Sequence, residues 1–165
     1  MAELSRKDDC IFCKIIYNEE PSTKIYEDEY VICIKNIKPV STHHYLILPK
    51  THIRNAKDLT REHAEIFEKM ISALDIVIQQ QGLDRAATRT GFHWPPFNTV
   101  NHLHLHVISP VENMNFLNKI IYLPGSFQFS NTPEPWVACN KHSELVQGAR
   151  NVRVVGQRTR SRDLR

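Results

Sequence analysis

Three histidines alternate with apolar residues in the segment 102–107, which reads HLHLHV. Successive side chains of a β-strand point to opposite faces, and neighbours on one face are about 6.6 Å apart. The imidazoles of His102, His104 and His106 therefore share one face, while the apolar side chains share the other and pack on the core. Because closely spaced protonated imidazoles repel one another, we expect this row to have perturbed pKa values.

Three roles suit such an imidazole face. The simplest role is a polar strand face exposed to solvent, but lysine, threonine or glutamate would be less costly than three histidines in that role. Neutral imidazole is also a common metal ligand. Near neutral pH it is in addition a nucleophile and a good leaving group, so it forms covalent intermediates at phosphorus that water then hydrolyses. Since neighbouring rings can donate hydrogen bonds to an anionic phosphorus centre, the row points to metal binding or to phosphorus chemistry.

A second candidate site lies near the N-terminus, where Cys10 and Cys13 have the C-x-x-C spacing of a zinc knuckle. The first ten residues, MAELSRKDDC, hold no apolar segment typical of a secretory signal. We therefore expect the cytoplasm, a reducing compartment in which disulfides are rare. The cysteine pair then has two interpretations, a zinc site or two reduced thiols without metal.

The spacing of apolar residues predicts the helices and strands that carry these side chains. The clearest helix is predicted over residues 60–81, where apolar residues recur at helical spacing and Gly82 suits the C-terminal end. A short apolar turn over residues 11–17 carries the cysteine pair. Two strands joined around Asp28 and Glu29 suggest a hairpin. Strands are predicted over residues 24–27, 30–34, 45–48, 86–93 and 102–108.

Length and charge bound the remaining possibilities. The chain has 165 residues, of which 41% are hydrophobic and 24% charged, as expected of one soluble globular domain. We expect no membrane span, because no run of about 18 apolar residues occurs. We divide the chain into a flexible N-terminus (1–7), one domain (8–130) and a basic, largely disordered tail (131–165).

The net charge of +3 is unevenly distributed. Residues 150–165 hold six arginines and one aspartate, while residues 1–149 hold 15 basic and 17 acidic groups. The body is therefore close to neutral, and its charge gives no indication of nucleic-acid binding.

The histidine row resembles the signature of the histidine triad (HIT) superfamily of nucleotide hydrolases and transferases. Residues 10–16 (CIFCKII) and 44–52 (HYLILPKTH) are similar to two further motifs of that superfamily, in the same order. Residues 89–97 (RTGFHWPPF) and 116–119 (FLNK) resemble its aprataxin-related branch. The resemblance covers residues 8–123. It implies an α+β, HIT-like fold, with an antiparallel sheet of about five strands, one long helix and a short N-terminal helix.

The resemblance also implies catalytic roles. The middle histidine, His104, would attack the α-phosphorus of a nucleoside phosphoramidate or acyl-adenylate and leave a nucleotidyl-imidazole, which water hydrolyses to a nucleoside monophosphate. His106 would bind the phosphoryl oxygens or assist the leaving group. His102 and His44 would line the same pocket.

Further residues match positions that contact substrate or metal in the superfamily. Apolar positions that enclose base and ribose correspond to Ile11, Phe12, Ile15, Ile34 and Ile37, for each of which core packing is the alternative. Asn36 stands where the superfamily usually has an aspartate for the ribose hydroxyls. Thr99 matches a serine that hydrogen-bonds the phosphate, and His93 is expected to touch the phosphate or the base edge. The implied zinc ligands are Cys10, Cys13, His52 and His102, and the chemistry itself requires no cofactor.

Three functions remain in competition. The first is a phosphoramidase and acyl-adenylate hydrolase that releases AMP from small purine nucleotide conjugates. The second is an aprataxin-like deadenylase of nucleic-acid ends, and the third is a non-catalytic scaffold that binds nucleotides. The near-neutral body argues against the second, and the complete histidine set argues against the third. The resemblance further implies a homodimer, for which the long helix could supply the interface, and a location in the cytoplasm and also the nucleus.

Overall fold

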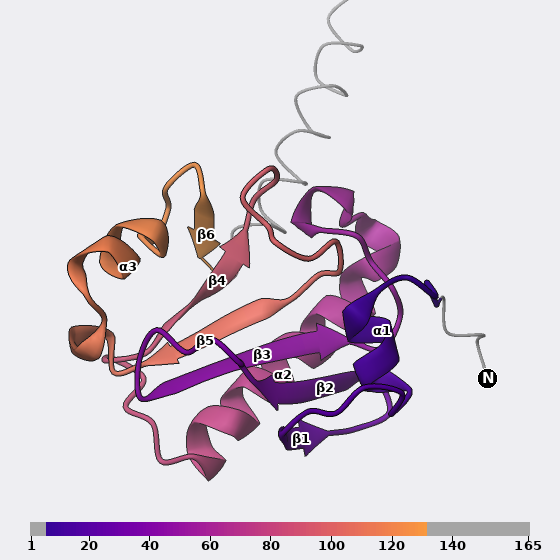
Figure 1. Cartoon of the computed structure of the whole chain (residues 1–165), viewed down its shortest axis with the longest axis horizontal. Helices are drawn as coiled ribbons and strands as arrows, with labels where there is room; N and C mark the ends of the chain where they lie inside the picture. The colour runs from indigo at the N-terminus through magenta and orange to yellow at the C-terminus, as the bar shows by residue number, and fades with distance from the viewer. Residues whose placement is uncertain (1–5, 132–165) are drawn as a thin grey trace, which may run out of the picture.

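The structure, a computed structural model that describes residues 6–131, is built on one antiparallel sheet (Figure 1). The strand order is β1-β2-β3-β5-β4-β6, and every neighbouring pair is antiparallel. The strands are β1 (Lys24–Glu27), β2 (Val31–Lys35), β3 (His43–Pro49), β4 (Arg89–His93), β5 (Leu105–Ser109) and β6 (Phe129–Asn131). The helices are α1 (Ile11–Ile16), α2 (Ala64–Gln80) and α3 (Phe116–Ile121).

The two faces of the sheet are covered by different helices (Figure 1). Alternate residues of β3 divide between them: Tyr45 and Ile47 pack with α2, whereas Leu46 and Leu48 pack with α1. Because both faces are buried, the strand is apolar on consecutive positions rather than strictly alternating. In the register, Leu46 pairs with His106, which places the imidazole row on the α1 face.

Helix α2 supplies most of the core on the opposite face. Its buried side chains Phe67, Met70, Leu74 and Val77 follow helical spacing. The helix is followed by Gly82, whose φ of 61° is a left-handed conformation that glycine adopts without a steric penalty. The predicted first turn is a separate 3₁₀ turn (Arg61–His63), which has Thr60 as its N-cap residue.

The α+β class, the β1–β2 hairpin, the long helix and the short N-terminal helix are confirmed. The strand count is six rather than about five, because β6 adds to the outer edge of β4. The strand β6 has only three residues, and α3 has no buried side chain, so neither produces a recognisable apolar period. The predicted tail lies almost wholly outside the described residues, and the domain boundaries stay a prediction.

The histidine strand begins at Leu105 rather than at His102. The preceding residues are held outside the ladder, because the Leu103 N–H donates to the carbonyl of Ile53 at 2.6 Å. The alternation of faces nevertheless continues through this segment: Leu103 is buried in the α2 core, and the imidazoles stay on the α1 face. Among the described residues, no helix is long and apolar enough to cross a bilayer.

The edge strand β6 packs so closely on β4 that only glycine fits at position 91. A Cβ atom on Gly91 would lie 2.2 Å from the Ser130 carbonyl oxygen and 2.6 Å from the Phe129 ring. Neither a backbone carbonyl nor a ring buried beside the imidazoles can move cheaply.

We predict that Gly91→Ala lowers the free energy of unfolding by about 1–3 kcal/mol, because β6 must shift away from β4. Urea denaturation measures this loss. Gly125→Ala is the comparison variant, because no heavy atom lies within 4 Å of its added Cβ and its cost comes from a positive φ of 69° instead of from a close contact. If Gly91→Ala leaves the free energy of unfolding unchanged, the close approach of β6 to β4 is wrong.

Candidate active site and metal site

The predicted catalytic histidines gather on the α1 face of the sheet. His44 comes from β3 and His106 from β5, while His102 and His104 precede β5. All four are buried, and His104, at 7%, is the most exposed of them. His106 is central, with its ring centroid 5.2 Å from that of His44, 5.0 Å from that of His104 and 4.9 Å from that of His93.

A chain of hydrogen bonds sets the proton positions on His44 and His106. The backbone N–H of Val40 donates to Nδ1 of His44 at 3.2 Å, so the His44 proton sits on Nε2. That N–H in turn donates to Nδ1 of His106 at 2.9 Å. The His106 proton must then sit on Nε2, which is buried and has no partner among the described residues. A buried donor without a partner is costly, so this N–H is available for an acceptor brought by a ligand.

His104 has the opposite tautomer. Its Nδ1 lies 2.6 Å from the carbonyl oxygen of His102, so the Nδ1–H donates and Nε2 keeps its lone pair. Burial lowers the pKa of His104 to about 4, although the hydrogen bond to the carbonyl acts in the opposite direction. The ring is therefore neutral at pH 7, the form in which an imidazole acts as a nucleophile.

The neighbouring imidazoles are neutral for the same reason. Burial lowers the pKa of His44 to about 4 and that of His106 well below its ordinary value. Burial also lowers the pKa of His93, against a smaller opposing effect of the Gln128 carbonyl. A row of neutral rings avoids the mutual repulsion expected of protonated ones.

Two aromatic side chains border the imidazole row at opposite ends. Phe12 of α1 meets His104 edge-on at 5.3 Å between ring centroids and His102 at 5.9 Å. At the other end Tyr122, directly after α3, lies 5.3 Å from His106 and 4.8 Å from His93. The sequence did not single out Tyr122, whose only signal is an aromatic residue that closes a short apolar segment.

The residues expected to enclose the base and ribose are placed unevenly. Phe12 and Ile15 of α1 are buried in one apolar cluster with Ile34 of β2. Ile11 is 42% exposed and Ile37 is 92% exposed, so these two present open apolar surface.

Asn36 and Thr99 differ in how closely they approach the row. The Asn36 side-chain oxygen accepts the Lys38 N–H at 3.0 Å, and its amide nitrogen lies 3.2 Å from Nε2 of His44. Asn36 is thus beside the row, with its oxygen already engaged. Thr99 is exposed, and no contact among the described residues joins it to the imidazoles.

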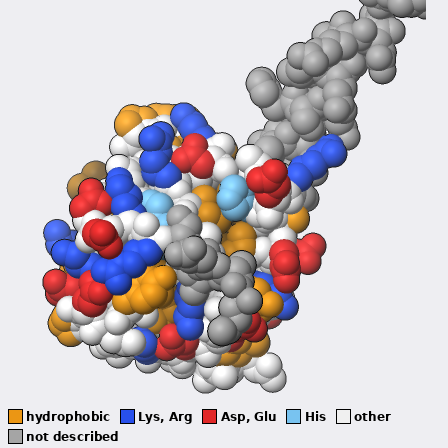
Figure 2. All heavy atoms as spheres, turned by 90° about the vertical axis from the view of Figure 1, so that its right-hand side faces the viewer, with side chains coloured by type: hydrophobic (Ala, Val, Ile, Leu, Met, Phe, Trp, Pro, Cys, Tyr) orange, Lys and Arg blue, Asp and Glu red, His pale blue; other side chains and the backbone are white. Residues whose placement is uncertain are grey.

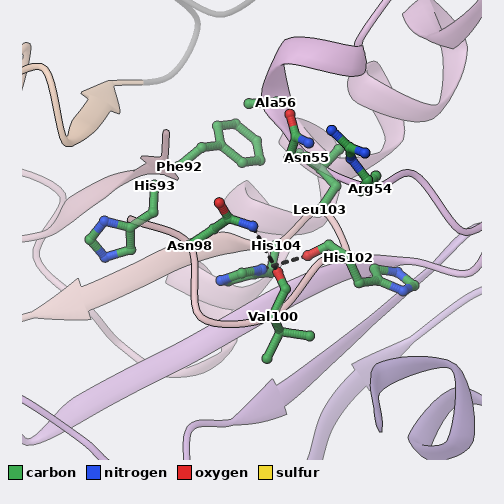
Figure 3. A pocket seen from close by; sticks show the side chains of 10 residues that line it. All are labelled: Arg54, Asn55, Ala56, Phe92, His93, Asn98, Val100, His102, Leu103 and His104. Atoms are coloured by element: carbon green, nitrogen blue, oxygen red, sulfur yellow. Dashed lines mark hydrogen bonds between the residues drawn. The ribbon is translucent and has the colours of Figure 1, made fainter. Parts of the chain in front are cut away.

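A small cavity lies against the inner side of His104, with Asn98, His93 and Asn55 in its wall (Figure 3). Its volume is about 10 Å³, which is room for one water molecule. A nucleotide does not fit there and has to reach the row from outside, across the surface that Phe12 and Tyr122 border.

The predicted metal ligands converge at the other side of His102. Sγ of Cys10 lies 3.5 Å and Sγ of Cys13 lies 3.6 Å from Nδ1 of His102. Nδ1 of His52 lies 3.4 Å from the Cys13 sulfur and 3.2 Å from Nδ1 of His102. The four ligand atoms all lie within 4.8 Å of one another.

This arrangement fits a tetrahedral metal ion. Zinc bonds of about 2.3 Å to sulfur and about 2.0 Å to nitrogen place neighbouring ligand atoms about 3.3–3.8 Å apart. Nε2–H of His102 donates to the Pro49 carbonyl at 2.9 Å, which leaves the Nδ1 lone pair directed at the thiols. Burial raises the pKa of the Cys13 thiol to about 11, so a cation would be needed to hold it as a thiolate.

Surface charge gives little support to a nucleic-acid site. On the side of the molecule where α1 lies, acidic and basic side chains are interspersed (Figure 2). Strong binding of a phosphate backbone requires a continuous basic surface, which the described side chains in this view do not form.

Comparison with known proteins finds relatives that match most of this chain. A family profile described as "Scavenger mRNA decapping enzyme C-term binding" matches residues 9–122. A Mus musculus relative named adenosine 5'-monophosphoramidase HINT3 is 42% identical over 123 residues, which are 73% of this chain and 74% of the relative. Aprataxin of Danio rerio is 34% identical over 92 residues, 55% of this chain and 28% of that protein.

Solved structures show the same fold. A HIT family hydrolase from Clostridium thermocellum superposes with a TM-score of 0.61 at 39% identity, covering 64% of this chain and 94% of that one. A histidine triad protein from Clostridium difficile gives a TM-score of 0.60 at 31% identity, covering 62% and 91%.

The buried neutral rings make stability depend on pH. Because the pKa values of His44 and His106 are lowered in the folded state, the unfolded chain binds protons at mildly acidic pH that the folded chain does not. We predict that the free energy of unfolding is flat above about pH 7 and falls between about pH 6.5 and 4, by about 1.4 kcal/mol per unit of pKa difference.

Urea denaturation of the wild type and of His44→Gln at several pH values measures this slope. The variant keeps every candidate metal ligand, so the difference between the two slopes isolates His44. We expect a shallower slope for the variant, and equal slopes would contradict the assignment.

Proposed function

The chain belongs to the histidine triad (HIT) superfamily, and on that premise we propose that it is a nucleotide hydrolase. It cleaves the P–N bond of adenosine phosphoramidates and the acyl-phosphate bond of acyl-adenylates through a nucleotidyl-His104 intermediate, and it releases AMP. The observation that carries this proposal is the pair of opposite tautomers. Nε2 of His104 offers a lone pair, while Nε2 of the adjacent His106 offers a proton that has no partner among the described residues.

In the first step, Nε2 of His104 attacks the α-phosphorus and the bond from phosphorus to the leaving group breaks. A phosphoramidate nitrogen that is protonated when the substrate binds leaves as a neutral amine, and an acyl-adenylate releases a carboxylate anion, so no ring has to give up its proton. The positive charge that develops on the His104 ring is stabilised by the His102 carbonyl, which accepts the Nδ1–H. Nε2–H of His106 is available to hydrogen-bond a phosphoryl oxygen in the same step.

In the second step, water attacks the phosphorus and the bond to His104 breaks. AMP leaves, one proton passes to solvent, and the ring returns to its neutral tautomer. The same hydrogen bonds act in both steps because the Val40 N–H and the His102 carbonyl are backbone groups that do not titrate.

The nucleoside is proposed to lie at the Phe12 end of the row. Phe12, Ile15 and Ile34 form an apolar cluster there, and Phe12 already touches the His104 ring. Asn36 lies close to His44, so we propose that its amide group contacts the ribose.

His104→Ala is predicted to reduce hydrolysis of adenosine 5'-phosphoramidate by about a thousandfold or more, because it removes the nucleophile. The matched control is His43→Ala, the adjacent histidine of β3, which bonds the Tyr45 hydroxyl on the opposite face at 2.8 Å. A steady-state assay of AMP release compares the two variants, and we expect the control to retain wild-type activity.

Adenylated nicked DNA is assayed in parallel with the same proteins. Turnover of the small substrate that depends on His104 supports the proposal. Turnover of the DNA alone would instead indicate a deadenylase, and AMP binding without any turnover would indicate a scaffold.

We propose further that the Cys10, Cys13, His52 and His102 cluster holds structural zinc. The ligand spacing and the free lone pair on His102 support this. When bound, zinc would fix α1 against the segment before β5, and it would leave His104 free for the chemistry.

Elemental analysis of protein purified without chelators is predicted to find about one zinc per chain, and Cys13→Ser is expected to lose it. The control is Cys33→Ala, since Cys33 is buried on the other face of the sheet in the α2 core. Far less than one zinc per chain in the wild type would refute the proposal.

The homodimer and the location in the cytoplasm and nucleus remain part of this proposal. A dimer interface is better supported at α3 than at α2. Phe116 and Leu117 are 75% and 68% exposed, and contiguous exposed apolar surface often marks an interface. The outer side of α2 presents Glu65, Glu68 and Asp75 instead.

A further inference from the structure

Tyr122 has an unusual position for a residue outside the histidine set. Its ring lies 5.8 Å from His44, 5.3 Å from His106 and 4.8 Å from His93, and it packs on Phe129 at 5.3 Å. Burial raises the pKa of the phenol, which is therefore neutral. Each of these four contacts is made by the ring, so we expect its shape rather than its hydroxyl to act on the site.

The position of Tyr122 is set by β4. The helix α3 that precedes it has no buried residue and therefore little apolar attachment of its own. Instead, the Arg89 guanidinium donates to the carbonyl oxygens of Lys119 and Tyr122 at 3.2 and 3.1 Å, at the C-terminal end of α3. Arg89 and His93 are the two ends of β4, so one strand carries both an imidazole of the pocket and the group that holds Tyr122 against it.

The two ends of the row differ in what they can accept. The Phe12 end has the apolar cluster to which the proposed function assigns the nucleoside. Among the described residues, the Tyr122 end has the unpartnered Nε2–H of His106 and the aromatic pair of Tyr122 and Phe129, in place of the aliphatic side chains that cluster with Phe12. In the substrate, before His104 attacks, a phosphorus atom with its nucleoside toward Phe12 carries its other large substituent, the leaving group, opposite Nε2 of His104, and we place that group on the side that Tyr122 borders.

We propose that Tyr122 selects the leaving group. Its ring forms a wall beside His106 that admits a small amine and rejects a bulky one, and Arg89 is the positioning residue that holds this wall in place. This inference rests on the proposed function, since it assigns the second half of the same substrate.

The test compares two adenosine phosphoramidates, one that releases ammonia and one that releases cyclohexylamine. Removing the ring by Tyr122→Ala is expected to raise kcat/KM for the bulky substrate relative to the small one by about tenfold or more, as is typical when a pocket wall is removed. Tyr122→Phe keeps the ring and is expected to keep the wild-type ratio. Arg89→Gln is expected to shift the ratio in the same direction as Tyr122→Ala, by a smaller factor.

The control variant is Phe127→Ala, an aromatic residue between α3 and β6 that is 77% exposed and packs on Phe97 instead of the imidazoles. Titration calorimetry with AMP reports whether each variant is folded, and the dissociation constant is expected to stay within about twofold of wild type, because the nucleoside end is untouched.

The possible results distinguish a failure of the role proposed for Tyr122 from a failure of the proposed hydrolase activity. If the wild type turns over neither phosphoramidate, the proposed function fails and the inference fails with it. If the wild type is active but Tyr122→Ala slows both substrates equally, Tyr122 has only a structural role and the inference alone is overturned. If Tyr122→Phe also shifts the ratio, the hydroxyl of Tyr122 rather than its ring selects the leaving group, and the proposed role of the ring is wrong.

Discussion

The structure depends on one constraint, which is that several imidazoles are buried side by side and every ring nitrogen needs a defined role. A buried polar atom without a partner is costly, and a buried charge more so. The protein meets this constraint with backbone groups. The Val40 N–H fixes the tautomer of His44, the His102 carbonyl that of His104, and the Pro49 carbonyl that of His102. The hydrogen bond from His44 to His106 then determines which nitrogen of His106 carries the proton. Nε2 of His106 has no partner in the described part of the chain, and we propose that it donates to the substrate.

The same constraint joins the candidate metal site to the catalytic pocket. His102 takes part in both, because its Nδ1 faces the thiols while its carbonyl accepts the proton of His104. Phe12 lies between the two cysteines in α1 and packs on both rings. A metal that fixes α1 and His102 would therefore also keep Phe12 and His104 in place, without taking part in the reaction.

Much of this site was predictable because its residues follow simple periodic rules. Strand alternation alone placed His104 and His106 on one face, and the C-x-x-C spacing marked Cys10 and Cys13. What the sequence did not indicate are contacts made by the backbone or by distant segments. The donors and acceptors that set the tautomers are peptide groups, which have no residue signature. Tyr122 is held at the pocket partly by Arg89, which binds the end of a helix with no buried side chain, and neither α3 nor β6 has a period that a local pattern could reveal.

The central claim is that the imidazoles are neutral and hold their protons on assigned nitrogens before substrate arrives. Nitrogen-15 NMR of the histidine rings at pH 7 tests it most directly, because protonated and lone-pair nitrogens resonate at distinct positions. We expect neutral rings throughout the row, with the proton of His104 on Nδ1 and that of His106 on Nε2. A His104 ring that carries its proton on Nε2, or that is positively charged at pH 7, would contradict it.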